Sequence, residues 1–399
     1  MPSKRERKNC KSPNAAAMDG CILPQDMMDC IITRLPVKSI HRFKSVCKPL
    51  RQVFSSPKFA KTHRAQFSQN LENQSVLISC NNGKSTLTIS LLKIKEKKPT
   101  KLDIPFPQFP YFAVFIGCCN GLLCMAFPGQ LIALWNPALN NMVKRIPLPN
   151  LEIGDIKMVS LGLGYNEEAD DFTVVRIVYL EKNEKTSIGV GVYSANSNSW
   201  SIIDVGFQFI VTQFRNDVIV NGNPYWEARV NGKLVLVCFD VRRMVFKIVP
   251  LPNFFHDKVR DVLFVDLNGD LGALVCNKKN DETVLSLDVW VFDDVGNVGW
   301  AKNRSFGPIE VKVHRFLQCL ENGKILVGEG LEDGKLFVFD TESGGVKEIM
   351  IDGAKKGSFE VHGYTESLTY IKGMKFYDKR RSRRFSGEIF KRVLRAPLV

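Results

Sequence analysis

Few residues in this sequence stand at spacings that would support catalysis or the binding of a cofactor. The run Asn82–Ser85 has the order that ends a phosphate-binding loop, but the glycine expected five residues before Gly83 is missing. Asp266, Asn268 and Asp270 alternate as the ligands of a calcium loop do, yet no glutamate stands at the twelfth position. Both segments are therefore predicted to be turns between strands.

The histidines, cysteines and adjacent carboxylates do not form a reactive set either. The pairs Asp170–Asp171 and Asp293–Asp294 consist of neighbours, which point to opposite faces of a strand. The 11 cysteines include no C-x-x-C pair, and the five histidines show no metal-ligand spacing. The histidines are His41, His63, His256, His314 and His362. The sequence thus predicts no catalytic residue, no metal, no cofactor and no enzyme activity.

The net charge of +14 is concentrated at the two ends of the chain. Residues 1–65 carry 14 Lys and Arg against 4 Asp and Glu, a balance of +10, and residues 371–399 carry 10 against 2, a balance of +8. The middle keeps 31 against 35, a balance of −4. This acidic middle makes nucleic acid an unexpected partner. The basic run Lys379–Arg384 has the composition of a nuclear localisation signal, or of a segment that contacts nucleic acid or anionic lipid, and equally of a solvated tail.

Targeting signals are missing from the sequence. No apolar run approaches the roughly 20 residues of a membrane span. Met1–Asn14 is polar and basic and lacks the apolar core of a signal peptide. Without a secretory signal, an odd number of cysteines indicates reduced thiols. We therefore expect no membrane partner and a location in the cytoplasm, the nucleus or both.

Residues 23–63 show the periodicity of short helices. Apolar residues recur at helical spacing from Met27 to Leu35, and the pattern restarts after Pro36 and again after Pro49. Three helices in so short a segment make a small core. An apolar surface left over from that core would need a partner.

From about Val76 the pattern changes to short β-branched and alternating runs separated by turn residues. An aromatic residue followed by Asn, Ser or Asp occurs five times, at intervals of 58, 46, 53 and 47 residues. These pairs are Trp135–Asn136, Tyr193–Ser194, Phe239–Asp240, Phe292–Asp293 and Phe339–Asp340. An Asn-Gly pair, which suits a hairpin turn, lies upstream of four of them. The interval favours a β-propeller over a β-sandwich, with the segments before Gly117 and after Phe359 available to close the ring.

Residues 23–63 resemble an F-box, because the Leu-Pro opening and the RLPVKS, RFKSVCK and SSPKF segments stand in F-box order. Leu50 stands where that pattern usually has tryptophan, which predicts weaker adaptor binding. The rest of the chain resembles the F-box-associated, kelch-like domain of plant F-box proteins. The matching segments are Cys119–Met125, Leu134–Pro149, Leu161–Val178, Val192–Trp200, Asn221–Trp226, Phe239–Pro252 and Tyr364–Leu368.

The resemblance implies an α+β protein overall, with a small three-helix F-box followed by an all-β, propeller-like domain. The expected parts are a disordered basic leader at 1–21, the F-box module at 22–65, the β domain at 75–370 and a basic tail at 371–399. The implied function is that of a substrate-recognition adaptor in a Skp–cullin–F-box ubiquitin ligase. The F-box would dock a Skp-type adaptor and, through it, the cullin and RING subunits. The β domain would hold an unidentified target protein for ubiquitination and degradation.

The residues that the resemblance assigns to adaptor binding are apolar or proline. They are Leu23, Pro24, Ile31, Ile32, Leu35, Pro36, Ile40, Phe43 and Val46. Periodicity does not decide which of them contact the adaptor and which form the internal core. The alternative function is that of a β-propeller scaffold outside any ligase, with basic tails that contact nucleic acid.

Two loops of the β domain contain aromatic residues that could anchor a target. They are Gly206–Asn216, with Phe207, Phe209 and Phe214, and Asn253–Arg260, with Phe254, Phe255 and His256. The same aromatics would equally suit the core of strands. The sequence therefore assigns no single residue to target binding.

Overall fold

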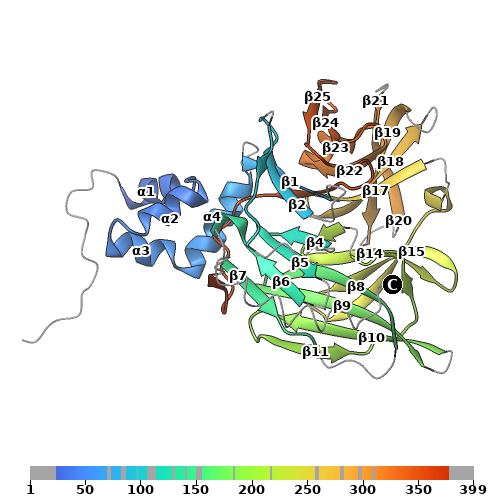
Figure 1. The fold of residues 1–399 in the computed structure, drawn as a ribbon, viewed down its shortest axis with the longest axis horizontal. Coiled ribbons are helices and arrows are strands. Elements are labelled where there is room, and N and C mark those ends of the chain that lie inside the picture. The colour runs from blue at the N-terminus through green and yellow to red at the C-terminus, as the bar shows by residue number, and fades with distance from the viewer. Residues whose placement is uncertain are drawn as a thin grey trace, which may run out of the picture.

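The computed structural model describes residues 24–69, 73–81, 87–96, 98–105, 114–127, 131–139, 142–149, 155–182, 185–215, 218–256, 260–278, 283–294, 299–307 and 311–376. Four helices come first: α1 (Gln25–Ile32), α2 (Val37–Phe43), α3 (Lys48–Phe54) and α4 (Pro57–Gln69). The first three are the helices predicted from the sequence. The fourth continues past the predicted boundary at residue 65. Figure 1 shows the helices gathered at one end of the molecule.

Proline sets where the first two helices begin. Pro24 and Pro36 are the N-terminal cap residues of α1 and α2. The carbonyl of Pro24 accepts the N–H of Met28 at 3.0 Å, and that of Pro36 accepts the N–H of Ile40 at 3.1 Å. A residue that precedes proline is disfavoured in helical conformation, so Pro36 prevents a helix from continuing through Leu35. These local preferences explain why the sequence alone located the helices.

The strands form six antiparallel sheets, which we call blades, and all except β26 and β27 follow the order of the chain from one blade to the next. Blade 1 contains β26 (Glu360–Tyr364), β1 (Ser75–Asn81), β2 (Leu87–Lys93) and β3 (Thr100–Lys101). Blade 2 contains β4 (Val114–Cys119), β5 (Leu122–Phe127), β6 (Leu131–Trp135), β7 (Met142–Ile146) and the edge strand β27 (Lys375–Phe376). Blade 3 contains β8 (Asp155–Asn166), β9 (Asp171–Lys182), β10 (Lys185–Ser194) and β11 (Ser199–Ile203).

The second half of the ring repeats this plan. Blade 4 contains β12 (Ile210–Val211), β13 (Val218–Val220), β14 (Asn223–Val230), β15 (Lys233–Asp240) and β16 (Val245–Pro250). Blade 5 contains β17 (Arg260–Leu267), β18 (Asp270–Lys278), β19 (Thr283–Asp293), β20 (Gly299–Phe306) and β21 (Val311–Lys312). Blade 6 contains β22 (Arg315–Leu320), β23 (Ile325–Glu329), β24 (Lys335–Asp340) and β25 (Val346–Met350). Three short 3-10 turns complete the described elements: η2 (Pro137–Leu139), η3 (Asn253–His256) and η4 (Glu321–Gly323).

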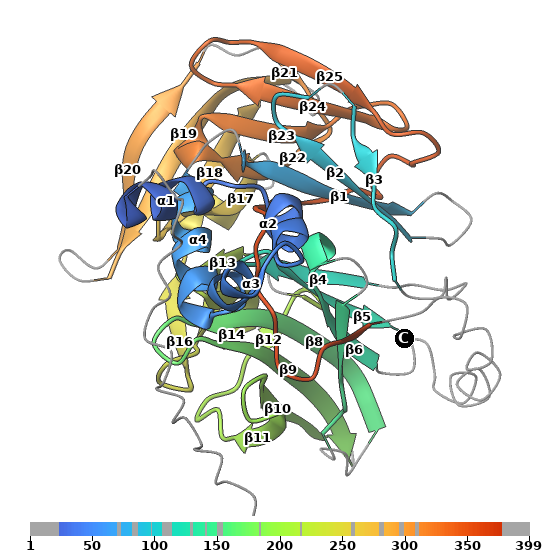
Figure 2. The ribbon, with the colours of Figure 1, turned by 90° about the vertical axis from the view of Figure 1, so that its left-hand side faces the viewer.

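The six blades close into a ring, which confirms the predicted propeller. Their inner strands contact one another in the order β26, β4, β8, β14, then β13, β17, β22 and back to β26. Closure depends on the pairing of β26 with β1, which joins the C-terminal part of the chain to the first blade. Figure 2 shows the ring face-on, with the helices in front of it. The segments before Gly117 and after Phe359 thus supply the sixth blade that the repeat left open.

Apolar side chains fill the space between blades. Each of the six neighbouring pairs of blades shares one buried cluster, including the pair formed by blades 6 and 1. Trp135, Tyr193 and Phe239, which are aromatic marks of the sequence repeat, are fully buried in three of these clusters. The repeat therefore marks the end of the third strand in blades 2 to 6, counted from the inner strand, and its aromatic side chain is buried in all of these blades except blade 5.

The Asn-Gly pairs form hairpin turns at three of the four predicted places. Asn120, Asn221 and Asn268 all have positive φ angles, between 48° and 55°, and the glycine after each also has a positive φ. Two such residues in succession suit the twist of a hairpin. The fourth predicted turn, at Asn322–Gly323, is instead part of η4, where the positive φ angles belong to Glu321 and Gly323.

Two tryptophans of the outer strands join neighbouring blades. Trp300 Nε1 of β20 donates a hydrogen bond to the carbonyl of Pro250 at 2.8 Å, and Trp200 Nε1 of β11 donates to the carbonyl of Pro147. Both prolines lie in the Pro-Leu-Pro segments that follow the fourth strands of blades 2 and 4. At two blade boundaries, a tryptophan of one blade thus donates a hydrogen bond to the Pro-Leu-Pro segment of its neighbour.

The described chain after residue 370 belongs to the propeller, which corrects the predicted boundary of the basic tail. Ile371 and Met374 are buried in the cluster between blades 2 and 3. The Nζ of Lys144 donates to the carbonyl of Lys372 at 2.6 Å, and β27 pairs with β7. The predicted leader at 1–21 and the run Lys379–Arg384 lie outside the described residues.

Candidate partner-binding site

The inner faces of the helices share one core with the propeller. Ile32, Val37, Ile40 and Phe54 are buried in a cluster that also contains Leu368 from the segment after β26. Ala138 and Leu139 of η2 belong to the same cluster. Burial of these faces against another element fixes the helical module on blade 2 and leaves its opposite faces outward.

Charged and aromatic side chains add to this contact at α4. Nη2 of Arg64 donates to the Tyr165 hydroxyl at 2.6 Å and lies 3.8 Å from Oδ1 of Asp170. The Tyr165 hydroxyl donates to the same Asp170 oxygen, and the Arg64 guanidinium stacks 4.9 Å from the Tyr165 ring centre. Burial, followed by the hydrogen bond to Asp170, raises the pKa of Tyr165, so this hydroxyl stays protonated and remains a donor. The contact orients α4 at the end of β8.

The outer faces of the first three helices expose large apolar side chains. Met27 and Ile31 of α1, Phe43 at the end of α2, Val46 just after it and Val53 of α3 are each between 40% and 68% exposed. Single exposed apolar residues are ordinary, but five within 27 residues on helices that project from the propeller form a candidate docking surface. We call these five residues the apolar helical face.

The structure divides the nine residues that the resemblance assigned to adaptor binding. Ile31, Phe43 and Val46 belong to the apolar helical face, and Pro24 and Pro36 are also exposed. Leu35 is half-buried. Ile32 and Ile40 are 7% and 0% exposed, so they form the internal core and do not present a surface to a partner. Leu23 lies outside the described residues.

Two residues of this face were not among the predicted contacts. Met27 precedes Ile31 by four residues and shares its side of α1, a spacing visible in the sequence. The exposure of Val53 follows from its position next to Phe54. Phe54 is buried in the core, and adjacent residues of a helix point in different directions. Leu50, which stands where an F-box usually has tryptophan, is half-buried against the core. This substitution therefore affects the internal packing of the helical module.

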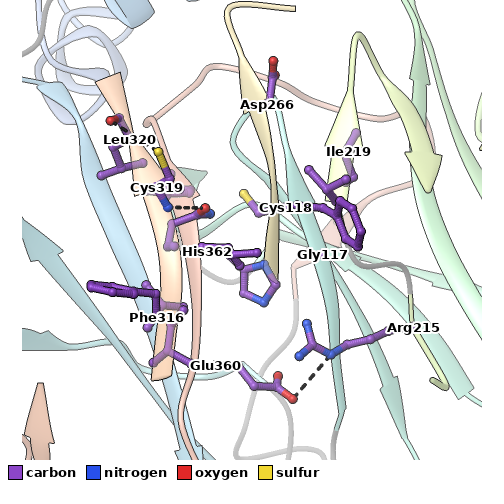
Figure 3. Close-up of a pocket in the computed structure, with 18 of the residues that line it drawn as sticks. Gly117, Cys118, Arg215, Ile219, Asp266, Phe316, Cys319, Leu320, Glu360 and His362 are labelled. Atoms are coloured by element: carbon purple, nitrogen blue, oxygen red, sulfur yellow. Dashed lines mark hydrogen bonds and ion pairs between the residues drawn. The ribbon is translucent and has the colours of Figure 1, made fainter. Parts of the chain in front are cut away.

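A second candidate site is a cavity of about 790 Å³ in the centre of the ring. Inner strands β4, β13, β17, β22 and β26 contribute to its wall. Figure 3 shows Arg215 and Glu360 directed toward each other across it, with His362 beside them. Burial, helped by nearby Arg215, lowers the pKa of His362 to about 3, so this imidazole is neutral in ordinary buffers.

The cavity wall offers no activated nucleophile among the described thiols. Burial raises the pKa of Cys319 to about 12, and it also raises the pKa of Cys118. A thiol that resists ionisation is a poor nucleophile and metal ligand. Within the described ranges, no group of three or more His, Cys, Asp or Glu residues is placed to hold a metal ion. In the same ranges, no helix is long and apolar enough to cross a membrane.

The aromatic residues of the two candidate loops differ in burial. Phe209 and Phe255 are buried, in the clusters between blades 3 and 4 and between blades 4 and 5. Phe207 is half-buried against the first of these clusters. Phe214 is 48% exposed. Of the aromatics in these two loops whose side chains are described, Phe214 alone is an exposed candidate anchor.

Sequence comparisons agree with this architecture. Residues 21–62 match the F-box domain, and residues 66–371 match the F-box associated beta propeller domain. An F-box/kelch-repeat protein of Arabidopsis thaliana is 29% identical over 294 residues, which cover 70% of this chain and 78% of that protein. An F-box/LRR-repeat/kelch-repeat protein of the same plant is 26% identical over 374 residues, covering 89% and 94%.

A solved structure from Bacteroides uniformis, a putative 6-phosphogluconolactonase, is 10% identical at a TM-score of 0.37, covering 73% of this chain and 99% of that one. This similarity is too low to indicate anything about function. The two family matches span nearly all of the described chain and coincide with the helical module and the ring of blades. The chain therefore belongs to the family of F-box proteins with an F-box associated β-propeller domain.

Proposed function

We propose that this protein is the substrate-recognition adaptor of a Skp–cullin–F-box ubiquitin ligase. The apolar helical face would bind the Skp-type adaptor, which connects to the cullin and RING subunits, and the propeller would hold the target protein. The observation that carries the proposal is the exposure of Met27, Ile31, Phe43, Val46 and Val53 on an F-box domain. Burying such a surface against a partner is favourable because it removes apolar area from water.

The contact between helices and propeller supports this role. A ligase adaptor works by proximity, because it holds the target and the ubiquitin-loaded enzyme at a high effective concentration. The shared core at Leu139 and Leu368, with the Arg64–Tyr165 hydrogen bond, fixes the propeller relative to the F-box. No nucleophile of the adaptor itself is needed, since the enzyme that carries ubiquitin supplies the chemistry.

The state of the cysteines supports a location in the cytoplasm, the nucleus or both. None of the nine cysteines within the described ranges forms a disulfide. Reduced thiols persist in compartments where glutathione and thioredoxin act. The ligase function proposed above also requires the chain to occupy the same compartment as the Skp-type, cullin and RING subunits.

The proposal is tested by co-purification with a plant Skp-type adaptor. The wild-type chain should retain the adaptor, and the double variant Ile31→Ser, Val46→Ser should weaken binding by about 30-fold, which corresponds to about 2 kcal/mol. Val346→Ser is the matched control, because Val346 is equally exposed but lies on the outer strand β25. Titration by isothermal calorimetry gives the dissociation constants.

Both outcomes are informative once circular dichroism shows that the variants are folded. Unchanged affinity of the Ile31→Ser, Val46→Ser variant would show that the apolar helical face does not contact the Skp-type adaptor. If the folded wild-type chain binds no Skp-type adaptor, the proposed ligase function is contradicted. Strong, salt-sensitive binding of nucleic acid by such a chain would instead favour the scaffold alternative.

A further inference from the structure

The central cavity has one end beside the helices and one end away from them. Arg64 of α4 and Tyr364, the last residue of β26, both line the cavity. Glu360, the first residue of β26, lines it four residues earlier, which is about 13 Å along an extended strand. In Figure 3, Arg215 and Glu360 occupy one end and Asp266 the other. We call the end with Arg215 and Glu360 the distal mouth.

A long ion pair spans the distal mouth. Arg215 is held beside β8 of blade 3 through a bridge to Leu161, whereas Glu360 belongs to blade 1, and blade 2 lies between them. Nε of Arg215 is 3.6 Å from Oε1 of Glu360, and the side chains are 22% and 24% exposed. That distance is longer than a hydrogen bond. An incoming cation at hydrogen-bond distance would therefore be a better partner for Glu360.

The cavity wall carries more carboxylates than guanidinium groups. The carboxylates among its described residues are Glu227, Asp261, Asp266, Glu321 and Glu360, and the guanidinium groups are Arg64, Arg215 and Arg315. Arg315 is already committed, because its Nε lies 2.9 Å from Oε2 of the buried Glu329. His362 adds no positive charge because burial lowers its pKa to about 3. Burial raises the pKa of Glu360, whereas nearby Arg215 lowers it, and a cationic ligand beside this carboxylate would likewise favour its ionised form. A wall with this excess of carboxylates is complementary to such a ligand.

An exposed aromatic residue stands next to the distal mouth on a fixed backbone. Phe214 directly precedes Arg215, and its carbonyl accepts the N–H of Leu161 at 2.9 Å. Ile210, in the same loop, is 58% exposed and pairs through its backbone with Arg229 of β14. Because the backbone that carries Phe214 is already held in place, this segment loses little freedom on binding, and an exposed aromatic residue there makes a good anchor.

We propose that the target protein binds at the distal mouth through an extended segment. A lysine or arginine of that segment enters the cavity beside Glu360, and an apolar neighbour packs on Phe214. The cavity volume of about 790 Å³ is ample for one long side chain and its water. This inference rests on the proposed function for the existence of a target, and it names the site and the chemistry of recognition.

The test uses the purified full chain and two pools of fluorescent hexapeptides. One pool has Leu-Arg at its centre and the other has Leu-Glu, and the remaining positions are equimolar mixtures. Fluorescence polarisation should show about tenfold tighter binding of the Leu-Arg pool, which weakens as salt is added. Glu360→Gln and Phe214→Ser should each weaken that binding about fivefold or more. Val346→Ser on β25 should leave it unchanged.

Three results would overturn the proposal. The first is equal affinity for the two pools or binding to neither. The second is unchanged Leu-Arg affinity in folded Glu360→Gln and Phe214→Ser variants. The third is equally tight binding of arginine amide, which would identify a small-molecule site. None of these measurements involves the Skp-type adaptor, so their failure is distinguishable from failure of the ligase proposal.

Discussion

At the scale of single residues, His63 joins α4 to the segment between α1 and α2. Its ring is fully buried between Phe59 and Phe67, with ring-centre distances of 5.9 Å and 5.0 Å. Its Nε2 donates to the carbonyl of Leu35 at 2.8 Å, so Nδ1 carries the lone pair of a neutral imidazole. Burial lowers the pKa of His63, although the hydrogen bond to Leu35 opposes this. Protonation would place a charge in the core of the module.

We expect the helical module to loosen as the pH falls below the usual histidine pKa of about 6.5. In that range the unfolded state binds a proton that the folded state resists, so the free energy of unfolding decreases as the pH falls. Hydrogen exchange of α2 to α4, corrected for intrinsic rates, should be faster at about pH 5.5 than at about pH 7.5. His63→Gln keeps an N–H donor and should reduce the difference. Equal protection of the wild type at both pH values would contradict this account.

At the scale of elements, the segment after β26 connects the helices to the ring. Nδ2 of Asn136 donates to the carbonyls of Ser367 and Thr369 at 3.0 Å and 2.9 Å. The Ser367 hydroxyl donates to the carbonyl of Asn120 at 2.7 Å. Between these polar contacts Leu368 enters the core of the helical module. One short segment therefore holds blade 2 and the F-box together.

Leu368→Ala should destabilise this junction by about 2–3 kcal/mol, because it removes buried methyl groups and leaves a cavity. The change is measured as the free energy of opening of α2 and α3 from native-state hydrogen exchange. Val346→Ala on the exposed outer strand is the control and should change it by less than about 0.5 kcal/mol. Unaltered protection of α2 and α3 in Leu368→Ala would show that the helices are held independently of this segment.

At the scale of the whole molecule, stability depends on a ring that is closed by distant parts of the chain. Pairing of Val76 to Ser79 with residues of β26 spans nearly 300 positions in the sequence. The cluster between blades 6 and 1 contains Val361 of β26 alongside Val76 and Ile78. Loss of β26 would expose this cluster and an unpaired strand edge.

Two truncations test this dependence. A chain that ends at Phe376 keeps every described residue and should melt within about 2 °C of the full chain. A chain that ends at Gly357 lacks β26 and Leu368, and we expect it to lose the cooperative melting transition or to aggregate. Circular dichroism during heating measures both. A cooperative, undiminished transition in the shorter chain would mean that the ring holds without its closing strand.

The sequence by itself determined the features that depend on local conformation. Proline positions located the starts of α1 and α2, because proline fixes its own φ angle and restricts the residue before it. Asn-Gly pairs located hairpins, since these residues tolerate positive φ. The aromatic–polar repeat located the end of the third strand in five blades and predicted the propeller. Each of these signals lies within a few consecutive residues of the chain.

Only the tertiary structure decided which apolar residues face a partner. Ile31 and Ile32 are adjacent and chemically alike, yet Ile32 packs into a core that Leu139 and Leu368 complete from the propeller, and Ile31 remains exposed. The sequence also could not separate the buried Phe209 from the exposed Phe214, or place Arg215 opposite Glu360. Burial and charge pairing at these positions are set by contacts with other segments of the chain, such as Ile32 with Leu368 and Arg215 with Glu360, which no local pattern records.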